Sequence, residues 1–203
     1  MMRRFSWLFF AFLCVAVGLY PLAYLWIDRR FGLLSTKSAA LLADFAWNVG
    51  FYAHIMLGGL ALLAGWPQFS TRLRRERPVL HRTFGKIYVG AALPSALAGI
   101  AVGTQATGGP IAATGFIALG LVWFGSTLGG FWHIRQGRVA AHRRWMLFSF
   151  AACFAAVTLR IWLPILVAAF HDFISAYRVV AWLCWVPNLA VAAALARKIN
   201  SNH

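Results

Sequence analysis

The most unusual property of this chain is its shortage of charged residues, and of acidic residues above all. Only 11% of its 203 residues are charged, and 4 Asp and Glu stand against 19 Lys and Arg. A soluble domain has about a quarter of its residues charged, so this composition excludes an ordinary soluble protein. The apolar share is 62% and the mean hydropathy is +0.72, which indicates an integral membrane protein.

The acidic residues are also absent from the interior of every apolar run. They are Asp28, Asp44, Glu76 and Asp172, all in expected loops or at the ends of runs. Proton relays and cation pathways usually depend on ionisable groups within the spans, so a carboxylate-based pathway is disfavoured. No set of nucleophile, base and orienting group can be assembled either, and whether the chain is an enzyme stays open.

Cysteine is equally scarce. Cys14, Cys153 and Cys184 all lie within apolar runs and form no CxxC motif. Isolated cysteines in such surroundings indicate small packing residues, rather than a disulfide framework or a metal clamp.

Six apolar runs are long enough to cross a membrane, since a span takes about 20 residues. The first run is too long for the apolar core of a secretory signal and is followed by no small-residue cleavage site, so we interpret it as a helix. We predict an all-α integral membrane bundle of six helices, forming a single transmembrane domain over residues 1–203. The expected helices are about 5–27, 45–66, 84–103, 112–133, 145–169 and 179–196.

The basic residues predict the orientation, because Lys and Arg are retained on the cytoplasmic side. With an inner amino terminus, fourteen of them fall on the inner side and four on the outer side, Arg160 belonging to neither. Both termini are therefore expected to be cytoplasmic. The net charge of +15 is explained by a basic inner rim that faces anionic lipids, so membrane lipids are expected partners and nucleic acid is not. The outer four are Arg29, Arg30, Lys37 and Arg178.

Two His-Arg pairs, His81-Arg82 and His142-Arg143, each lie where a basic loop turns into an apolar run. Such boundaries are where a membrane protein can meet haem, a quinone head group or a lipid phosphate. Tyr88 shares a helix face with His81, seven residues earlier. Arginines followed by Trp, as after His142, are also ordinary membrane-boundary residues.

A second set of candidates lies deeper in the membrane, around His54. This residue heads a stripe with Gly58, Ala61 and Gly65, which share one helix face. The stripe predicts either close packing between helices or a flat groove for a planar ligand. His54 itself is expected to face the protein interior, as a ligand-binding group or as a neutral ring bonded to a main-chain carbonyl.

Arg160 is the one Lys or Arg residue that lies away from the ends of the predicted spans, and no acid in the spans can neutralise it. Counting along a straight helix places it in the outer part of the bilayer. Its side chain is expected either to extend to the outer surface or to contact main-chain carbonyls, Asp44 or Asp172 near the outer surface, outer-leaflet phosphates, or a bound anionic or carbonyl ligand. Together, His54 and Arg160 are positioned to enclose a ligand.

Several motifs in this order resemble one family. They are His54-x-x-x-Gly58-Gly59, Gln68-Phe69, His81-Arg82-x-x-Gly85-x-x-Tyr88, Gly115-Phe116, Trp123, His142-Arg-Arg-Trp145-Met146 and Thr158-x-Arg160. The set is similar to the bacterial membrane proteins grouped as domain of unknown function 2306, over about residues 48 to 165. The resemblance implies a multi-pass protein of the bacterial inner membrane, and it implies no activity.

Three functions therefore compete. The first is a b-type haem protein that exchanges electrons with quinone. His81 and His142 would ligate one haem b, with His133 as a spare, and arginines would hold the propionates. A second haem is not expected, because His54 has only His171 as a poor partner. The second function is a non-haem binding protein or permease for an anionic or quinone-like lipid, and the third is a structural subunit. The candidate site residues are His81, His142, His54, Arg82, Arg143, Arg160 and Tyr88.

Overall fold

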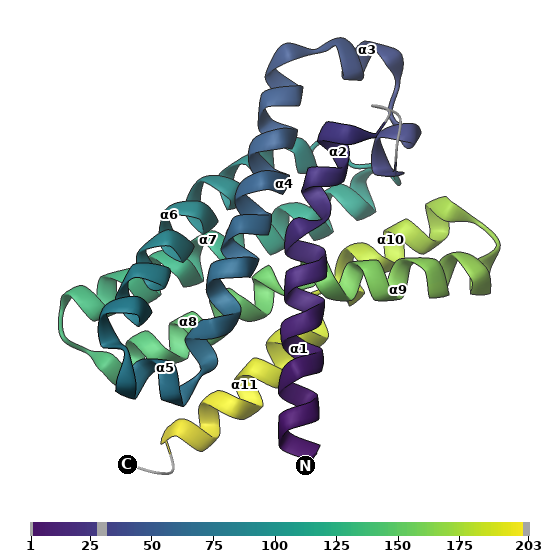
Figure 1. The fold of residues 1–203 in the computed structure, drawn as a ribbon. Helices are drawn as coiled ribbons and strands as arrows, with labels where there is room; N and C mark the ends of the chain where they lie inside the picture. The colour runs from purple at the N-terminus through teal and green to yellow at the C-terminus, as the bar shows by residue number, and fades with distance from the viewer. Residues whose placement is uncertain (1, 28–31, 201–203) are drawn as a thin grey trace.

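The computed structural model describes residues 2–27 and 32–200, and in this part of the chain every regular element is a helix. Six short 3₁₀ or α segments of the described chain connect or cover longer helices (Figure 1). The elements in chain order are α1 (Met2–Leu19), η1 (Tyr20–Leu22), α2 (Ala23–Trp26), η2 (Gly32–Thr36), α3 (Ala39–Ala43), α4 (Phe45–Gly65), η3 (Trp66–Phe69), α5 (Thr71–Glu76), α6 (Pro78–Gly103), α7 (Pro110–Arg135), α8 (Val139–Cys153), α9 (Ala155–Phe170), α10 (Phe173–Leu183) and α11 (Val186–Asn200).

Six segments of the described chain are long and apolar enough to cross a membrane, which confirms the predicted all-α six-span architecture. They are Phe5–Trp26, Phe45–Phe69, Pro78–Gly103, Pro110–Arg135, Val139–Phe170 and Phe173–Arg197. Many of their large apolar side chains point outward; Phe5, Phe12 and Trp26 are examples on the first span. Outward-facing apolar side chains are what a hydrocarbon environment favours.

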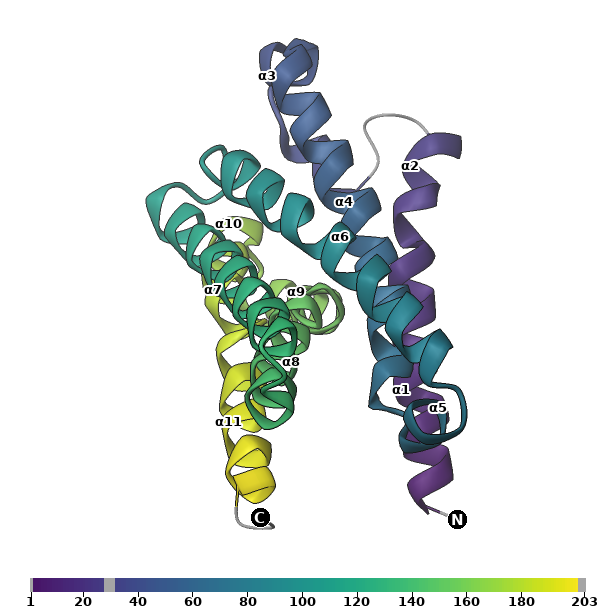
Figure 2. The same ribbon diagram turned by 90° about the vertical axis from the view of Figure 1, so that its left-hand side faces the viewer.

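Both ends of the chain lie at the same end of the bundle (Figures 1 and 2). This end also holds α5 and the turn between α7 and α8, and we call it the basic end because the Arg-rich segments gather there. The opposite end holds α3 and the turn between α6 and α7. Which of the two faces the cytoplasm stays a prediction, and of the charges predicted for the outer loop, Asp28, Arg29 and Arg30 lie outside the described residues.

The described acidic residues all have local structural roles. Asp44 caps α4, where its Oδ1 accepts a hydrogen bond from the Trp47 N–H at 2.7 Å. Asp172 caps α10 and accepts a bond from the Ser175 N–H at 2.8 Å, and hydrogen bonds from Ser175 hold the pKa of this carboxyl below its usual value. Glu76 pairs with Arg72 on the exposed surface of α5 at 2.8 Å. Among the described residues, no acid is left to neutralise a charge inside the bundle.

The last two spans are each broken into two helices, where the sequence predicted continuous ones. The fifth span breaks at Phe154, between α8 and α9, and the sixth breaks at Cys184, between α10 and α11. Between the two breaks, α9 and α10 run side by side across the direction of α1. Helix α9 is seen from the side in Figure 1 and end-on in Figure 2. A count of residues along a straight helix therefore misplaces what α9 carries.

Two polar side chains satisfy the backbone at these breaks. The Thr158 hydroxyl donates to the Cys184 carbonyl, and the Asn188 amide donates to the same carbonyl at 2.9 Å and to Thr158 Oγ1 at 3.1 Å. A broken helix inside a membrane survives only where side chains or other groups take up the freed carbonyls. Thr158 and Asn188 thereby fix the α9–α10 hairpin to α11.

Candidate functional site

The interior of the bundle contains a partly open cavity of about 630 Å³, which we call the central cavity. Its wall comes from both sides of the molecule: α1, α4 and α6 on one side, and α7, α9 and α10 on the other (Figure 2). Most of the wall is apolar or aromatic, including Phe51, Trp123 and Tyr177. His54 and Arg160 both line it, so the structure brings together the two buried candidates that the sequence singled out.

His54 is held by a double contact with α6. Its Nδ1 lies 2.9 Å from the Ser95 carbonyl oxygen, and the Ser95 hydroxyl donates to the His54 carbonyl at 2.8 Å. Because a carbonyl only accepts, Nδ1 carries the proton, and Nε2 of the neutral ring is a hydrogen-bond acceptor. The predicted bond to a main-chain carbonyl is present. It also fixes the ring at the wall of the central cavity.

The ring of His54 fits only because the facing residue on α6 is glycine. A methyl group at Gly99 would lie 2.7 Å from His54 Nδ1. Gly58, one turn along α4 from His54, also lines the central cavity, whereas Ala61 and Gly65 are buried. At Gly65 a methyl group would lie 2.7 Å from the Phe150 ring. The stripe on α4 therefore borders the central cavity at His54 and Gly58, and it packs against α8 at Gly65.

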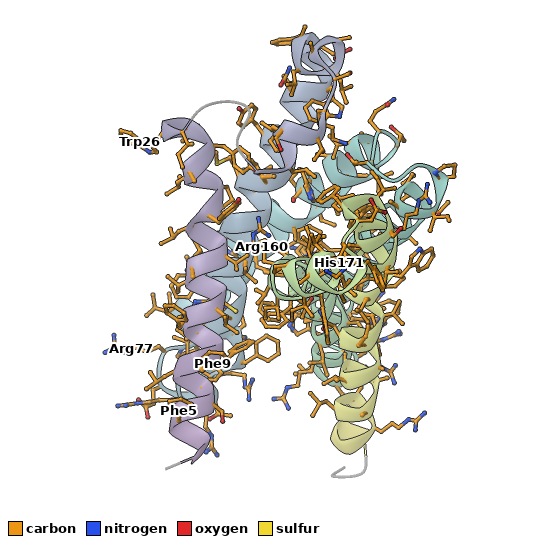
Figure 3. The ribbon with its side chains drawn as sticks, turned by 90° about the vertical axis from the view of Figure 1, so that its right-hand side faces the viewer. Phe5, Phe9, Trp26, Arg77, Arg160 and His171 are labelled. Atoms are coloured by element: carbon orange, nitrogen blue, oxygen red, sulfur yellow. The ribbon has the colours of Figure 1, made fainter. Side chains whose placement is uncertain are left out.

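Arg160 enters the central cavity from α9. Its guanidinium donates to the Ala156 carbonyl at 2.8 Å and lies over the Tyr20 ring, with 4.5 Å from Cζ to the ring centroid. Figure 3 shows Arg160 beside α1, at a level between Trp26 and Phe9. The side chain is thus held inside the bundle rather than extended to the surface. No acid among the described residues pairs with it.

The segment η2 covers the central cavity at the opposite end. Lys37 Nζ donates to the Gln105 carbonyl at 2.5 Å, and the hydroxyls of Thr36 and Thr107 are 3.0 Å apart. Burial lowers the pKa of Lys37. Leu34 is fully buried beneath this segment. The cover therefore rests on contacts with the α6–α7 turn and on one apolar anchor.

Tyr88, predicted as a site residue on the same face as His81, lies in the buried core instead of at the wall of the central cavity. Its hydroxyl is 2.7 Å from Ser149 Oγ and accepts a bond from the Trp123 indole at 3.3 Å. Ser149 Oγ is also 2.6 Å from Thr127 Oγ1. Only Trp123 of this network also lines the central cavity.

The two His-Arg pairs lie at the basic end, apart from the central cavity. His142 Nδ1 bonds to the Gly130 carbonyl at 2.8 Å. His81 has Arg74, His142, Arg143 and Arg82 as its electrostatic neighbours, so the two pairs lie at the same end of the bundle. His81 Nδ1 is buried and has no hydrogen-bond partner in the described chain.

The remaining histidines are elsewhere. His133 stacks on Trp145, with 6.2 Å between the ring centroids. His171 ends α9 in a left-handed conformation (φ 52°) at the tip of the α9–α10 hairpin (Figure 3), and it does not line the central cavity with His54. No group of three or more His, Cys, Asp or Glu that could hold a metal occurs among the described residues. Ligation of a haem by His81 and His142, which needs only two ligands, stays a prediction.

The sequence model of the family described as "Predicted membrane protein (DUF2306)" matches residues 51–196. The chain belongs to this family. The resemblance noted in the sequence is thereby confirmed, and it extends past 165 to include α10 and most of α11. Comparison with curated proteins and with solved structures finds no match.

The DUF2306 segment contains most, but not all, of the central cavity. It supplies His54, Ser95 and Arg160, while Tyr20, on which Arg160 stacks, and the covering segment η2 lie before it. The amino-terminal part of the chain therefore completes a cavity whose polar groups belong to the family segment.

Sequence reasoning missed several residues that position these groups within the DUF2306 segment. Ser95 and Asn188 are polar residues inside apolar spans, and that isolation was a signal of buried hydrogen bonds. Arg74 gave no comparable signal, because it lies in a loop rich in polar residues, and Gln68 was noted only as part of a family motif. Their position beside α6 follows only from the fold of α5 and η3.

Proposed function

We propose that this DUF2306 protein binds a quinone-type amphiphile in the central cavity, with the quinone ring between His54 and Arg160. The observation that carries the proposal is the pairing of a fixed acceptor, His54 Nε2, with a fixed cation that has no acidic partner, Arg160, in one largely apolar cavity.

Arg160 would bind a carbonyl oxygen on one side of the quinone ring. A buried guanidinium without a counter-charge is costly, because burial removes its hydration. The hydrogen bond to the Ala156 carbonyl and the contact with the Tyr20 ring leave some of its five N–H donors without an acceptor. A carbonyl oxygen of a quinone would accept bonds from the donors that remain.

His54 would bind a hydroxyl on the other side of the ring in the quinol form. Its Nδ1–H is committed to the Ser95 carbonyl, so Nε2 of the neutral ring accepts a hydrogen bond. A quinol hydroxyl donates such a bond, whereas a carboxylate or phosphate does not. The donor and the acceptor therefore fit a quinol better than the anionic lipid that is the alternative ligand.

The rest of the wall fits a ring with an apolar tail. Ligand pockets usually have volumes of about 300–1,000 Å³ and mainly apolar walls, and the central cavity, at about 630 Å³, lies within this range. Trp123, Phe116 and Tyr177 supply aromatic surface, against which a planar ring can pack.

The test is a binding titration of the protein in neutral detergent with short-chain ubiquinone and its quinol. Arg160→Gln should weaken quinone binding about tenfold or more, since a hydrogen bond to a charged group is worth about 1.5–3 kcal/mol. Arg138→Gln, which removes an exposed charge at the basic end, is the matched control and should bind as the parent does.

Two variants of His54 separate its two nitrogens. His54→Asn retains a donor for the Ser95 carbonyl and removes Nε2, so it should weaken quinol binding more than quinone binding. His54→Gln places an amide near the Nε2 position and should retain more of the quinol affinity. The proposal is wrong if neither form of the quinone binds, or if oleate binds in their place and is lost in Arg160→Gln.

A further inference from the structure

Four basic side chains gather at the basic end, and we call them the basic cluster: Arg74 on α5, His81 on α6, and His142 and Arg143 on α8. Arg74, His142 and Arg143 are all electrostatic neighbours of His81. The cluster thus joins α5 and α6, which follow each other in the sequence, to α8, which follows only after α7. None of its members lines the central cavity.

The basic cluster has no acidic partner. The nearest acid in sequence, Glu76, is bonded to Arg72 at 2.8 Å, and this is the one ion pair found in the described part of the chain. Partial burial, and then the positive charges of Arg143 and Arg75, lower the pKa of Arg74. Like charges at close range repel, so a bound anion would relieve a repulsion that the protein leaves uncompensated.

Two buried polar atoms beside the basic cluster lack hydrogen-bond partners. They are His81 Nδ1 and the Gln68 side-chain Nε2. Gln68 lies against the same helix, because its Oε1 is 3.8 Å from where a methyl group at Gly85 would be. Buried polar atoms are nearly always bonded, and an exception indicates a partner such as an ion or water.

The backbone adds to the positive potential here. His81 lies in the first turn of α6 and His142 in the first turn of α8. The first turn of a helix lies at the positive end of the helix dipole, which favours anions. The ligand that suits this place is therefore an anion. It would meet two such helix starts, the charges of Arg74 and Arg143, and the unpartnered His81.

We propose that the basic cluster binds a phosphate group, with Arg74 and Arg143 as its main donors. Arginine suits this ligand because its planar guanidinium donates two parallel hydrogen bonds to phosphate oxygens. The phosphate belongs to an anionic phospholipid head group or to a free phosphate ion, since the chemistry is the same. This site is separate from the central cavity and does not depend on the function proposed for it.

The competing ligand for the same residues is the haem predicted from the sequence. A phosphate uses the arginines together with the unpartnered Gln68 amide, whereas a haem would use the histidines as axial ligands. The two differ in a direct readout, because a haem gives a reducible absorbance band and a phosphate gives none.

The experiment measures binding of a fluorescent short-chain phosphatidylglycerol to the 203-residue protein in neutral detergent. The Arg74→Gln/Arg143→Gln double variant should lose at least about tenfold in affinity, since charge-assisted bonds to phosphate are among the strongest. Arg138→Gln removes one exposed charge at the same end and should lose less than about twofold, as expected for screened surface charges. Quinone binding at the central cavity and the helical circular dichroism check that each variant is folded.

Two further arms identify the source of the phosphate. If inorganic phosphate displaces the probe at constant ionic strength and chloride does not, the site takes free phosphate. If phosphatidylglycerol binds, phosphatidylcholine does not, and inorganic phosphate does not compete, the site takes a lipid head group. Equal losses in the double variant and in Arg138→Gln would overturn the proposal, and so would a reducible Soret band that disappears in His81→Ala and His142→Ala.

Discussion

The central cavity and the basic cluster use the same two residue types, histidine and arginine without an acidic partner, in opposite surroundings. In the central cavity, His54 is bonded to α6 through Nδ1, and Arg160 is stacked on Tyr20. At the basic end, His81 has an unpartnered nitrogen, and Arg143 is exposed among other arginines. One region is a rigid pair inside apolar walls, and the other is a concentration of positive charge at a boundary.

The difference shows that surroundings decide which ligand a His-Arg set can take. A single cation with a neutral acceptor, enclosed by aromatic rings, is suited to an uncharged ring with a carbonyl and a hydroxyl. Several cations around an unpartnered polar atom are suited to a compact anion. A variant that affects one region and leaves the other unchanged therefore tests this distinction.

The largest effect is expected from Gly99→Ala. The new methyl group would lie 2.7 Å from His54 Nδ1, so the ring has to move, and overpacking of this kind costs about 1–3 kcal/mol. Quinone binding should be lost while phosphatidylglycerol binding is retained. Titration with both ligands and thermal unfolding measure these effects.

Gly90→Ala is the matched control for that change. Gly90 lies on the same helix, α6, and has nothing within 4 Å of an added methyl group. It should leave both affinities unchanged and stabilise the helix by up to about 1 kcal/mol. Equal loss of quinone binding in both variants would show that α6, rather than the His54 ring, had been disturbed.

The next largest effect is expected from Thr158→Val, which retains the shape of the side chain and removes its hydroxyl. The Cys184 carbonyl and the Asn188 amide would each lose one bond while keeping the bond between them, and the net cost is about 0.5–1.5 kcal/mol for each bond lost. Because Thr158 fixes the hairpin that carries Arg160, quinone affinity should fall with the melting temperature.

Thr114→Val serves as its control, because the Thr114 hydroxyl bonds only to carbonyls of its own helix, Pro110 and Ile111, near the surface. It should change the melting temperature little. If Thr158→Val melts as Thr114→Val does, the break between α8 and α9 does not depend on this hydroxyl.

A smaller effect is expected from Tyr88→Phe. This change removes the hydroxyl shared by Ser149 and Trp123, and the net loss for such a hydrogen bond is about 0.5–1.5 kcal/mol. Tyr88 contributes to neither proposed site, so the thermal stability should fall while both affinities stay within about twofold of the parent. A selective loss of either ligand would assign Tyr88 to that ligand's site.

The smallest effect is expected from Glu76→Gln. It breaks the surface pair with Arg72 and leaves the basic end more positive. Such pairs contribute little to stability, so the melting temperature should not change measurably. Phosphatidylglycerol affinity should rise slightly, and the rise should disappear at high salt because exposed charges are screened. A fall in affinity would contradict an anion site at this end.

The spans could be predicted from the sequence because their signal is local. An apolar run such as 112–133 is long enough to cross a membrane whatever it packs against, and the observed span Pro110–Arg135 differs only at its ends. Successive loops alternate between the two ends of the bundle, and the gathering of basic residues at one end follows from this alternation.

The breaks at Phe154 and Cys184 could not be predicted in this way. They depend on hydrogen bonds between Thr158 and Asn188, which are 30 residues apart, and an apolar run with one amide looks continuous. The central cavity was only half foreseen for a related reason. His54 and Arg160 were identified as a pair, but Ser95, Gly99 and Tyr20 reach them only through helix packing.

The position of Arg160 has an electrical consequence. Its charge lies inside the bundle, between the levels of Trp26 and Phe9 (Figure 3), and therefore within the potential difference across the membrane. Moving one elementary charge through that whole difference is worth about 2.3 kcal/mol per 100 mV. An uncharged quinone reaching Arg160 would bind equally well in energised and in depolarised membranes. An anion would travel through part of the field, and its affinity would follow the membrane voltage.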